Sequence, residues 1–314
     1  VSVDGGTTWR WLGLEACEGT TFTYGFGPNT DSARFCFAIP YQASHLRAFL
    51  ARYGDCPALR AGVLCQTRKE REVEVLYLGV PTEPRYRVLL TARHHACEST
   101  ASYSLEGLMC EVLADSEVGR WLREYVAFMV VPFVDKDGVE DGDQGKSRRP
   151  HDHNRDYGTY VDPAAPSLYA VPAALRDQVP AWSEGELRMA LDLHCPWIRG
   201  EYNESIYFVG SPNKDHWCKV TTFASVLERV QKGPLPYHQE DNLPFGEAWN
   251  TVDNVAEGRP FSRWAAQLSG VDVASTLEIP YANVGTETVT ADKARAFGAD
   301  VARAIRQYLA DLNI

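Results

Sequence analysis

A continuous apolar run, YVAFMVVPFV at residues 125–134, is the feature that most constrains how this chain can fold. An uninterrupted apolar segment of this length is typical of a strand buried on both faces of a sheet. Strand patterns recur at 85–93, 186–194 and 275–281, and a long amphipathic helical pattern covers 291–312. Strands that alternate with helices predict a mixed, mainly parallel α/β sheet flanked by helices.

The amino-terminal part of the chain has a different pattern, with short segments rich in aromatic and β-branched residues separated by Gly, Pro, Asn and Asp. One helix is expected at 44–54, where Gly54 provides a stop. We therefore predict a small antiparallel β-sandwich domain at 1–82, followed by the α/β domain at 83–314. The strand candidates of the first domain are TFTYGF (21–26), ARFCFAIPY (33–41) and EVEVLYLGV (72–80).

The charge balance argues against nucleic acid as a partner. The chain has 31 basic and 42 acidic residues, a formal net charge of −11. Binding to the phosphate backbone requires a basic surface, and the one short basic cluster is Lys146, Arg148 and Arg149. No apolar run reaches the ~20 residues that cross a bilayer. We therefore expect neither nucleic acid nor membrane as a partner.

The compartment is less constrained. The first residues show neither the basic nor the apolar region of a signal peptide, so we favour the cytoplasm, while export of a longer precursor stays open. The eight cysteines form no CxxC pair, which argues against a cysteine zinc cluster. They are expected to be thiols in a reducing compartment, or disulfides if the protein is exported.

Candidate chemical residues follow three of the predicted strands. His95 follows the strand at 85–93, His194 ends the strand at 186–194, and Glu278 lies in the strand segment STLEIPY. In open α/β sheets, ligands bind beyond the carboxyl ends of the strands. We therefore expect these three side chains to meet at one edge of the sheet.

A metal centre is one interpretation of these residues. In His95-Ala96-Cys97-Glu98, an imidazole and a carboxylate three positions apart can bind the same ion, and catalytic zinc sites have three protein ligands of these types. His94 is the neighbouring competitor for that role. His194 would be the third ligand, with a satisfied buried histidine as the alternative.

The segment PFVDKDGVEDGDQGKSRRPHDHNRDYG (132–158) is dense in turn-forming and charged residues. Its alternating Asp and Gly suggest calcium, but the EF-hand pattern is not matched. A solvated surface loop is the simplest interpretation. Against it, HDHNRDY and the two adjacent arginines are suited to recognising a carboxylate through charge-assisted hydrogen bonds.

In combination and order, these motifs resemble the zinc carboxypeptidase family, most of all its cytosolic carboxypeptidase branch. The resemblance extends over nearly the whole chain, from a small amino-terminal β domain to the strand with Glu278. The segments that carry it are FAIPY (37–41), LCQT (64–67), ARHHACE (92–98), EG (106–107), PFVDKDGV (132–139), DHNR (152–155) and LDLH (191–194).

The resemblance implies a role for each matching residue. His95, Glu98 and His194 would bind one Zn²⁺ per chain, and Asp152 would orient His95 from behind. Asn154 and Arg155 would hold the terminal carboxylate of the substrate. Glu278 would deprotonate the zinc-bound water and pass the proton to the leaving amine.

The chain departs from the family pattern at two positions. The family has an arginine that stabilises the oxyanion, but position 145, where the spacing would place it, is Gly. Lys146, Arg148 and Arg149 are the nearby alternatives, of which we favour Arg148. The family also has a mobile tyrosine upstream of the base, and Tyr237 is a candidate at a spacing that is too long.

Specificity would depend on residues near Trp264, which resembles the Trp upstream of the base in the family. Ser262 and Arg263 would then border the side-chain pocket, and a basic Arg263 would suit an acidic carboxy-terminal residue. The alternative for Arg263 is an exposed side chain or a structural ion pair.

These residues predict a metallocarboxypeptidase acting on a peptide or a peptidoglycan-derived substrate, with the oligomeric state undetermined. An aspartoacylase-like zinc amidohydrolase acting on N-acyl amino acids would share the ligands and base. A binding module that has lost its chemistry is the third alternative, although it would require a missing ligand or base.

Overall fold

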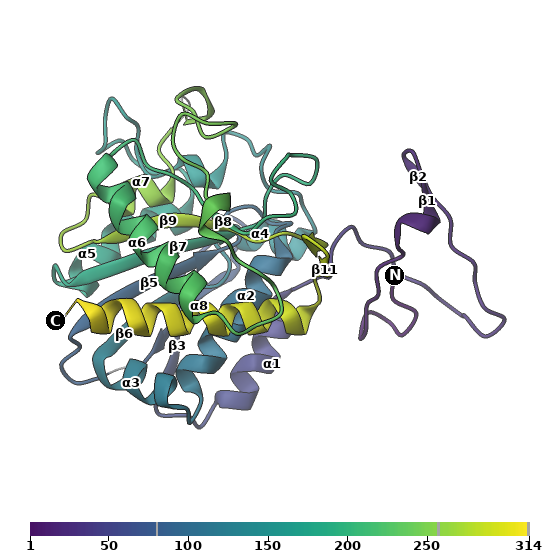
Figure 1. Cartoon of the computed structure of the whole chain (residues 1–314), viewed down its shortest axis with the longest axis horizontal. Coiled ribbons are helices and arrows are strands. Elements are labelled where there is room, and N and C mark those ends of the chain that lie inside the picture. Colours follow the sequence, from purple (N-terminus) through teal and green to yellow (C-terminus); the bar gives the residue numbers. More distant parts are fainter. Residues whose placement is uncertain (80, 256–257, 313–314) are drawn as a thin grey trace. The chain divides into compact units, whose positions relative to one another are not determined.

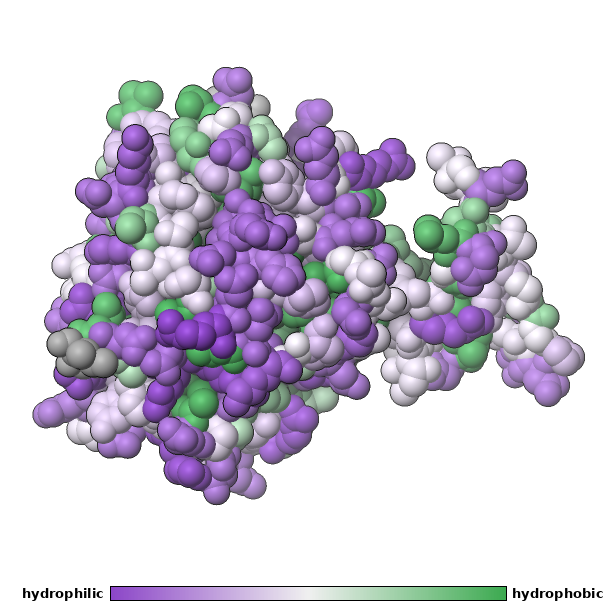
Figure 2. All heavy atoms as spheres, in the orientation of Figure 1, coloured by the Kyte–Doolittle hydropathy of each residue, from purple (hydrophilic) through white to green (hydrophobic). Residues whose placement is uncertain are grey.

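The computed structural model describes residues 1–79, 81–255 and 258–312. Its contacts divide the chain into two compact units, Val1–Pro40 and Tyr41–Ile314. The larger unit contains the predicted α/β architecture, with helices around a central sheet (Figure 1). The face of the molecule visible in Figure 2 is mainly hydrophilic, with scattered hydrophobic residues.

The central sheet has seven strands in the order β3-β4-β6-β5-β7-β9-β8. The pairs β6/β5, β5/β7 and β7/β9 are parallel, whereas the strands at the two edges pair antiparallel. This confirms the predicted mixed, mainly parallel sheet. The strands are β3 (Leu59–Gln66), β4 (Glu72–Leu78), β5 (Tyr86–Ala92), β6 (Val126–Val131), β7 (Leu187–His194), β8 (Tyr207–Phe208) and β9 (Val273–Glu278).

Helices flank the sheet. One core cluster joins Leu89 of β5 and Met129 of β6 to residues of α5 and α7, while α8 packs against both α2 and α6. In Figure 1, α8 crosses the sheet close to α2 and α6. The helices are α1 (Ala43–Tyr53), α2 (Ser99–Leu113), α3 (Glu117–Tyr125), α4 (Lys136–Asp141), α5 (Ala170–Ser183), α6 (Lys214–Val230), α7 (Phe261–Ala265) and α8 (Ala291–Asp311).

Two glycines explain how closely α2 and α8 approach. A Cβ at Gly107 would overlap the backbone of Arg295, and a Cβ at Gly298 would overlap the carbonyl oxygen of Ser104. The neighbouring Glu106 is buried and accepts hydrogen bonds from Arg295 Nε and from Tyr41, each at 2.8 Å. The packed helix pair supports the loop that leads from β5 into α2.

The domain boundary differs from the one expected at residue 82. The segment predicted as the strand 72–80 forms β4, which pairs with β6 and adds β3 to the edge of the central sheet. Its Val73, Val75, Leu76 and Leu78 are all buried, so both faces of β4 are covered, as in the interior of a large sheet. Among the described residues, 1–82 thus form no separate sandwich.

The smaller unit contains little regular structure. Its described strands are β1 (Cys17–Glu18) and β2 (Thr21–Phe22), which pair antiparallel, and one bridge joins Ser2 to Arg34. The predicted strands at 21–26 and 33–41 are therefore mostly irregular. Their aromatic side chains gave a strand pattern, but Phe26 and Phe35 are exposed and bury no core.

In the described part of the chain, no helix is both long enough and apolar enough to span a membrane. All eight cysteines are free thiols.

Candidate metal centre and active site

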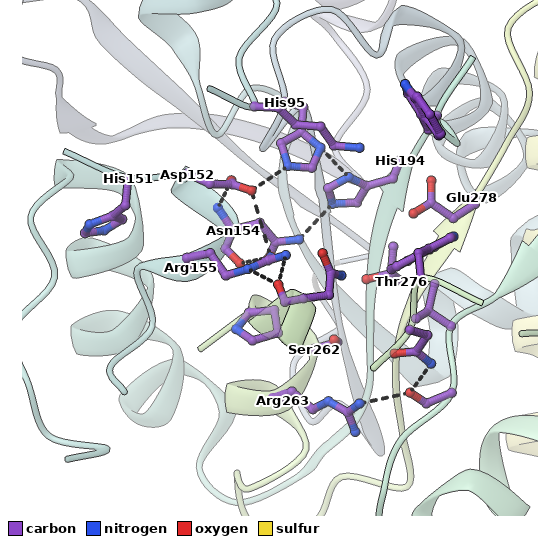
Figure 3. A pocket seen from close by; sticks show the side chains of 18 of the residues that line it. His95, His151, Asp152, Asn154, Arg155, His194, Ser262, Arg263, Thr276 and Glu278 are labelled. Atoms are coloured by element: carbon purple, nitrogen blue, oxygen red, sulfur yellow. Dashed lines mark hydrogen bonds and ion pairs between the residues drawn. The ribbon is translucent and has the colours of Figure 1, made fainter. Parts of the chain in front are cut away.

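Three ligand-type side chains converge at the carboxyl edge of the parallel strands. His95 and Glu98 lie in the loop between β5 and α2, and His194 is the last residue of the adjacent β7. His95 Nδ1 lies 2.8 Å from Glu98 Oε1 and 3.1 Å from His194 Nδ1, and His194 Nδ1 lies 2.8 Å from Glu98 Oε2. All three residues are buried (Figure 3 shows the two histidines facing each other).

The outer nitrogens of both imidazoles contact carboxylates. His95 Nε2 lies 3.1 Å from Asp152 Oδ2, and His194 Nε2 lies 2.6 Å from Asp192 Oδ2. An ionised carboxylate can only accept a hydrogen bond, so each Nε2 carries a proton, and in the metal-bound protein each Nδ1 would bind through its lone pair. Both lone pairs are therefore directed at the space between His95, His194 and Glu98.

This arrangement fits a small cation. Two imidazole lone pairs and a carboxylate repel one another unless positive charge lies between them. Ligand atoms around a tetrahedral zinc are about 3.3 Å apart for bonds of about 2.0–2.1 Å, close to the 2.8 Å and 3.1 Å separations here. Glu98 Oε2 is buried, and its one described close contact is His194 Nδ1 at 2.8 Å, a candidate ligand atom itself. The donor set is therefore one that can hold a metal ion.

Glu278 lies at the end of β9, where it is the register partner of His194 across the parallel β7/β9 pair. Its Oε2 is buried and makes no hydrogen bond to any described residue. Burial, reinforced by the charge of Glu98, raises the pKa of Glu278 to about 7, against the opposing effect of His194 and Lys146. A buried carboxyl whose pKa is near neutrality can exchange a proton with a bound ligand.

The loop that follows α4 packs on the loop that carries the ligands. Gly145 has a φ of +98°, and a Cβ at this position would overlap the backbone nitrogen of Ala96. The Cys97 amide also donates to Gln144 O at 3.2 Å. Close contact between the two backbones excludes an arginine at position 145, which explains the departure from the family pattern.

The cations that follow Gly145 have different environments. Lys146 Nζ lies 4.0 Å from Glu98 Oε1. The guanidinium of Arg148 is bound on one side to Asp135 Oδ2 at 2.6 and 2.9 Å and on the other to Asp143 Oδ2 at 2.6 Å. Both residues line the pocket. Arg148 is paired with two carboxylates there, so its role as the oxyanion donor stays a prediction, beside Lys146 as the alternative.

Asn154 and Arg155 lie beside the ligand cluster. Asn154 Oδ1 accepts from the Phe261 amide at 2.9 Å, which fixes the orientation of the side-chain amide and places Nδ2 3.3 Å from His194 Nε2. Since that nitrogen already donates to Asp192, the two N–H groups do not bond to each other. The hydrogens of Nδ2 are thus left for a ligand.

Arg155 donates to backbone carbonyls. Nη1 reaches Asn154 O at 2.8 Å, while Nε and Nη2 reach Asn254 O at 3.2 and 2.9 Å. The nearest carboxylate among the described residues is Asp152, 3.9 Å from Nη1. The guanidinium is therefore held in place by neutral acceptors and can bind an incoming carboxylate.

Arg263 lies farther from the metal ligands, on the other side of Asn154 and Arg155 in Figure 3. It donates to Ser211 Oγ at 2.7 Å and to Gly210 O at 3.0 Å, and it lies over the ring of Phe245. It forms no ion pair with any described residue, and burial lowers its pKa to about 10. The structural ion pair considered as an alternative is thus not formed among these residues.

One cavity joins these groups. It has a volume of about 720 Å³ and is lined by His95, His194 and Glu278 at one end and by Arg263 at the other. Cavities of roughly 300–1,000 Å³ hold small molecules or a short peptide end. Other lining residues are Lys146, Arg148, His151, Asp152, Asn154, Arg155, Trp197, Ser211, His216, Trp249, Ser262 and Thr276.

Tyr237 is not brought to this cavity. It is fully buried, and its hydroxyl lies 2.9 Å from Asn242 Oδ1. Asp192, Trp197 and Trp249 were not predicted. Asp192 could have been found from the pattern LDLH, because alternate residues of a strand point to the same face. Trp197 and Trp249 lie in irregular segments whose positions no periodic pattern indicates.

Comparison with known proteins finds similarity to proteins that are named cytosolic carboxypeptidases. No family model matches the chain. Cytosolic carboxypeptidase 3 of Mus musculus is 32% identical over 157 residues, which cover 48% of this chain and 16% of the relative. Cytosolic carboxypeptidase 3 of Bos taurus is 28% identical over 247 residues, which cover 76% of this chain and 24% of that relative. The similarity to the cytosolic carboxypeptidase branch is thereby confirmed, although the chain spans at most about a quarter of these two relatives.

The fold has a match among solved structures. A metallo-carboxypeptidase from Burkholderia cenocepacia superposes with a TM-score of 0.71 and 21% identity, covering 88% of this chain and 71% of that protein. This confirms a carboxypeptidase-like fold.

Proposed function

We propose that the protein is a zinc-dependent carboxypeptidase. The observation that carries the proposal is one cavity lined by the two histidines of a three-residue ligand cluster, by the buried carboxylate of Glu278 and by an arginine available for a terminal carboxylate. Zinc is the metal we propose, because two imidazoles and a carboxylate with room for a further ligand are its usual catalytic set. The similarity to proteins named cytosolic carboxypeptidases supports the same activity.

His95, Glu98 and His194 would hold the ion through His95 Nδ1, His194 Nδ1 and the Glu98 carboxylate. When bound, zinc acts as a Lewis acid toward the scissile carbonyl and makes water more acidic. Asp152 holds His95 in the required tautomer through its contact with Nε2.

Glu278 would be the general base. It takes a proton from the attacking water and then donates it to the leaving amine. Its place opposite His194 in the β7/β9 register puts it at the same edge of the sheet as the ligand cluster. The buried Oε2 without a described hydrogen-bond partner is available for that proton.

Lys146 would stabilise the oxyanion that develops on the substrate. A preorganised cation in a cavity with little water is effective in this role. Position 145 cannot carry the side chain, and Arg148 is paired with Asp135 and Asp143. The lysine ammonium is the one cation of the cluster Lys146, Arg148 and Arg149 with a described contact to a proposed metal ligand.

Asn154 and Arg155 would make the enzyme an exopeptidase. They line the cavity between the ligand cluster and Arg263, with N–H groups left for the carboxylate of a chain end. A peptide with an amidated end could not form the charge-assisted hydrogen bonds to Arg155.

Arg263 would select acidic carboxy-terminal residues. Its guanidinium lines the cavity without a described carboxylate partner, next to the polar Ser211. Leaving a half-buried cation unpaired is costly, and an aspartate or glutamate side chain of the substrate would compensate that cost. The proposed substrate is therefore a peptide or isopeptide with an acidic end, and a peptidoglycan-derived peptide is a further candidate. The expectation of a cytoplasmic enzyme that binds neither nucleic acid nor membrane belongs to the same proposal.

Glu278→Gln tests the proposal. The variant should keep about one zinc per chain, because Glu278 is outside the ligand cluster, yet lose hydrolysis of a peptide that ends in Glu. Full activity of the variant would contradict the assignment of the base. Parallel assays with N-acetyl-aspartate test the amidohydrolase alternative, which requires deacylation without release of carboxy-terminal residues.

A further inference from the structure

A buried chain of hydrogen bonds leads away from His194. Asp192 Oδ2 lies 2.6 Å from His194 Nε2, and Asp192 Oδ1 lies 2.8 Å from His94 Nδ1. His94 Nε2 in turn lies 2.8 Å from the hydroxyl of Tyr157. None of the four side chains is more than 2% exposed. No role in catalysis or binding has yet been given to His94, Asp192 or Tyr157.

The direction of every hydrogen bond in the chain follows from Asp192. An ionised carboxylate accepts only, so His194 Nε2 and His94 Nδ1 both donate to it, as does Thr91 Oγ1 at 2.8 Å. His94 Nε2 then has a lone pair, which accepts the proton of Tyr157. With the proton on Nε2, the metal-bound protein would use the lone pair of His194 Nδ1, the nitrogen that faces His95 and Glu98.

A second cation between His94, Asp192 and His194 is the competing interpretation, since their ligand atoms also lie close together. The hydrogen-bond partners favour the hydrogen-bonded series of side chains over a second metal site. Both nitrogens of His94 and both oxygens of Asp192 have partners. In the first cluster, by contrast, the described close contacts of Glu98 Oε1 and Oε2 are to Nδ1 of the two histidines, which are candidate ligand atoms themselves, and to Lys146 Nζ at 4.0 Å. The second set of ligand atoms is thus already satisfied without an ion.

Aromatic packing fixes the position of Tyr157, the last side chain of this hydrogen-bonded series. Tyr157 stacks on Trp264 with ring centroids 5.2 Å apart, and its ring meets Phe261 edge-on at 5.5 Å. The ring of His94 lies 5.6 Å from that of Phe261. Phe261 and Trp264 belong to α7, the helix that carries Arg263. The chain therefore connects a candidate metal ligand to the helix that borders the proposed specificity pocket.

We propose that Asp192 and His94 are positioning residues for the metal centre. Asp192 fixes the tautomer and the ring orientation of His194, and His94 fixes Asp192 in turn, with Tyr157 as the terminal donor. Outer partners of this kind affect metal affinity by about 10- to 100-fold. The inference rests on the proposed zinc site, but it concerns affinity for the ion and can be tested without a peptide.

Asp192→Asn is the most direct variant. The side-chain amide has only one oxygen, so it cannot accept hydrogen bonds from both imidazoles as the carboxylate does. If its NH₂ group faces His194, Nε2 must accept that hydrogen bond, and the histidine proton moves to Nδ1. That nitrogen could then no longer bind the ion. Competition with a chromophoric chelator should show zinc binding weakened on the order of 10- to 100-fold. Asp300→Asn is the matched control, because Asp300 is equally buried but receives its hydrogen bonds from the Lys232 and Gly233 amides and from Arg303, away from the histidines.

Variants of His94 and Tyr157 keep the test decisive if Asp192→Asn does not fold. His94→Leu removes the donor to Asp192 and should weaken zinc binding, whereas His94→Asn retains an N–H at a similar position and should restore part of the affinity. Tyr157→Phe keeps the ring packing and should have the smallest effect. The visible absorption of the Co²⁺-substituted protein should change in the same order, since it reports on the ligand geometry.

Wild-type zinc affinity in both Asp192→Asn and His94→Leu would overturn the proposal. Two zinc ions per chain in the wild type would overturn it in favour of a second metal site. Neither result would decide whether the wild-type enzyme cleaves peptides, so failure of this inference and failure of the proposed function remain distinguishable.

Discussion

The ammonium nitrogen of Lys146 lies 4.0 Å from Oε1 of Glu98, one of the three proposed metal ligands. Two residues farther along, Arg148 is held between Asp135 and Asp143. Position 145 itself cannot carry a cation, because the backbone of Gly145 contacts Ala96 so closely that no side chain fits. Under the proposal, a lysine displaced by one position would thus supply the positive charge of the arginine that the resemblance to zinc carboxypeptidases implies at position 145.

Lys146→Met should lower kcat for a peptide that ends in Glu by roughly 10²- to 10³-fold, the usual effect of losing one oxyanion donor. KM should change little, because the contact strengthens only as charge develops on the substrate. Steady-state kinetics on the zinc-loaded enzyme measure both constants. Lys146→Arg should retain part of the activity, and Arg148→Ala should affect stability more than kcat. If Arg148→Ala abolished turnover while Lys146→Met did not, the earlier prediction of Arg148 would be right.

Arg263→Ala should reduce kcat/KM by roughly 10- to 100-fold for a peptide that ends in Glu, since hydrogen bonds to charged groups contribute about 1.5–3 kcal/mol. The same peptide ending in Leu should be cleaved with little change or slightly faster. The ratio of the two kcat/KM values measures the effect. An equal loss for both peptides would mean that Arg263 has a structural role only.

In the metal-free protein, Glu278→Gln should increase stability at alkaline pH. The folded pKa of about 7 exceeds the ordinary value of 4.5, so the folded state holds a proton that the unfolded state has released between these pH values. Stability of the wild type therefore falls as pH rises through this window, by up to roughly 3 kcal/mol, and the variant lacks that loss.

Urea denaturation in the presence of a chelator at pH 5 and pH 8 tests this expectation. The advantage of Glu278→Gln over the wild type should be larger at pH 8. Glu240→Gln is the matched control, because Glu240 is exposed. An advantage independent of pH would show that burial does not shift the titration of Glu278.

Gly145→Ala should destabilise the protein and weaken zinc binding. The new Cβ would force the ligand loop away from the residues at 142–150, in addition to the strain of a positive φ, which costs about 1–3 kcal/mol. Gly142 also has a positive φ but has nothing within 4 Å of its Cβ position. Gly142→Ala should therefore lower the melting temperature without changing zinc affinity, and equal zinc affinities of the two variants would contradict this account.

The sequence predicted the fold best where an element is long and its pattern is unambiguous. The helices expected at 44–54 and 291–312 are α1 and α8, and the segment 186–194 forms β7 over Leu187–His194. The partner of a strand could not be predicted in the same way. The pattern of EVEVLYL indicates that it is a strand, but its pairing with β6 depends on contacts between distant segments.

In the candidate site, too, local patterns could be predicted from the sequence, whereas contacts between distant segments could not. Ends of parallel strands meet at one edge, so the meeting of His95, His194 and Glu278 could be expected from the strand pattern alone. The choice between Lys146 and Arg148 could not, because it depends on the backbone contact of Gly145 and on the carboxylates Asp135 and Asp143. The partnership of His94 with Tyr157 joins residues 63 positions apart and leaves no local pattern.

The most direct test of the central claim is mass spectrometry of two synthetic peptides after incubation with the zinc-loaded protein. The peptides share one sequence ending in Glu, and one has a free carboxylate while the other is amidated. The account predicts stepwise loss of residues from the carboxyl end of the free peptide, inhibition by a chelator, and no cleavage of the amidated peptide. Equal cleavage of both peptides, or no cleavage of either by protein that contains one zinc per chain, would contradict it.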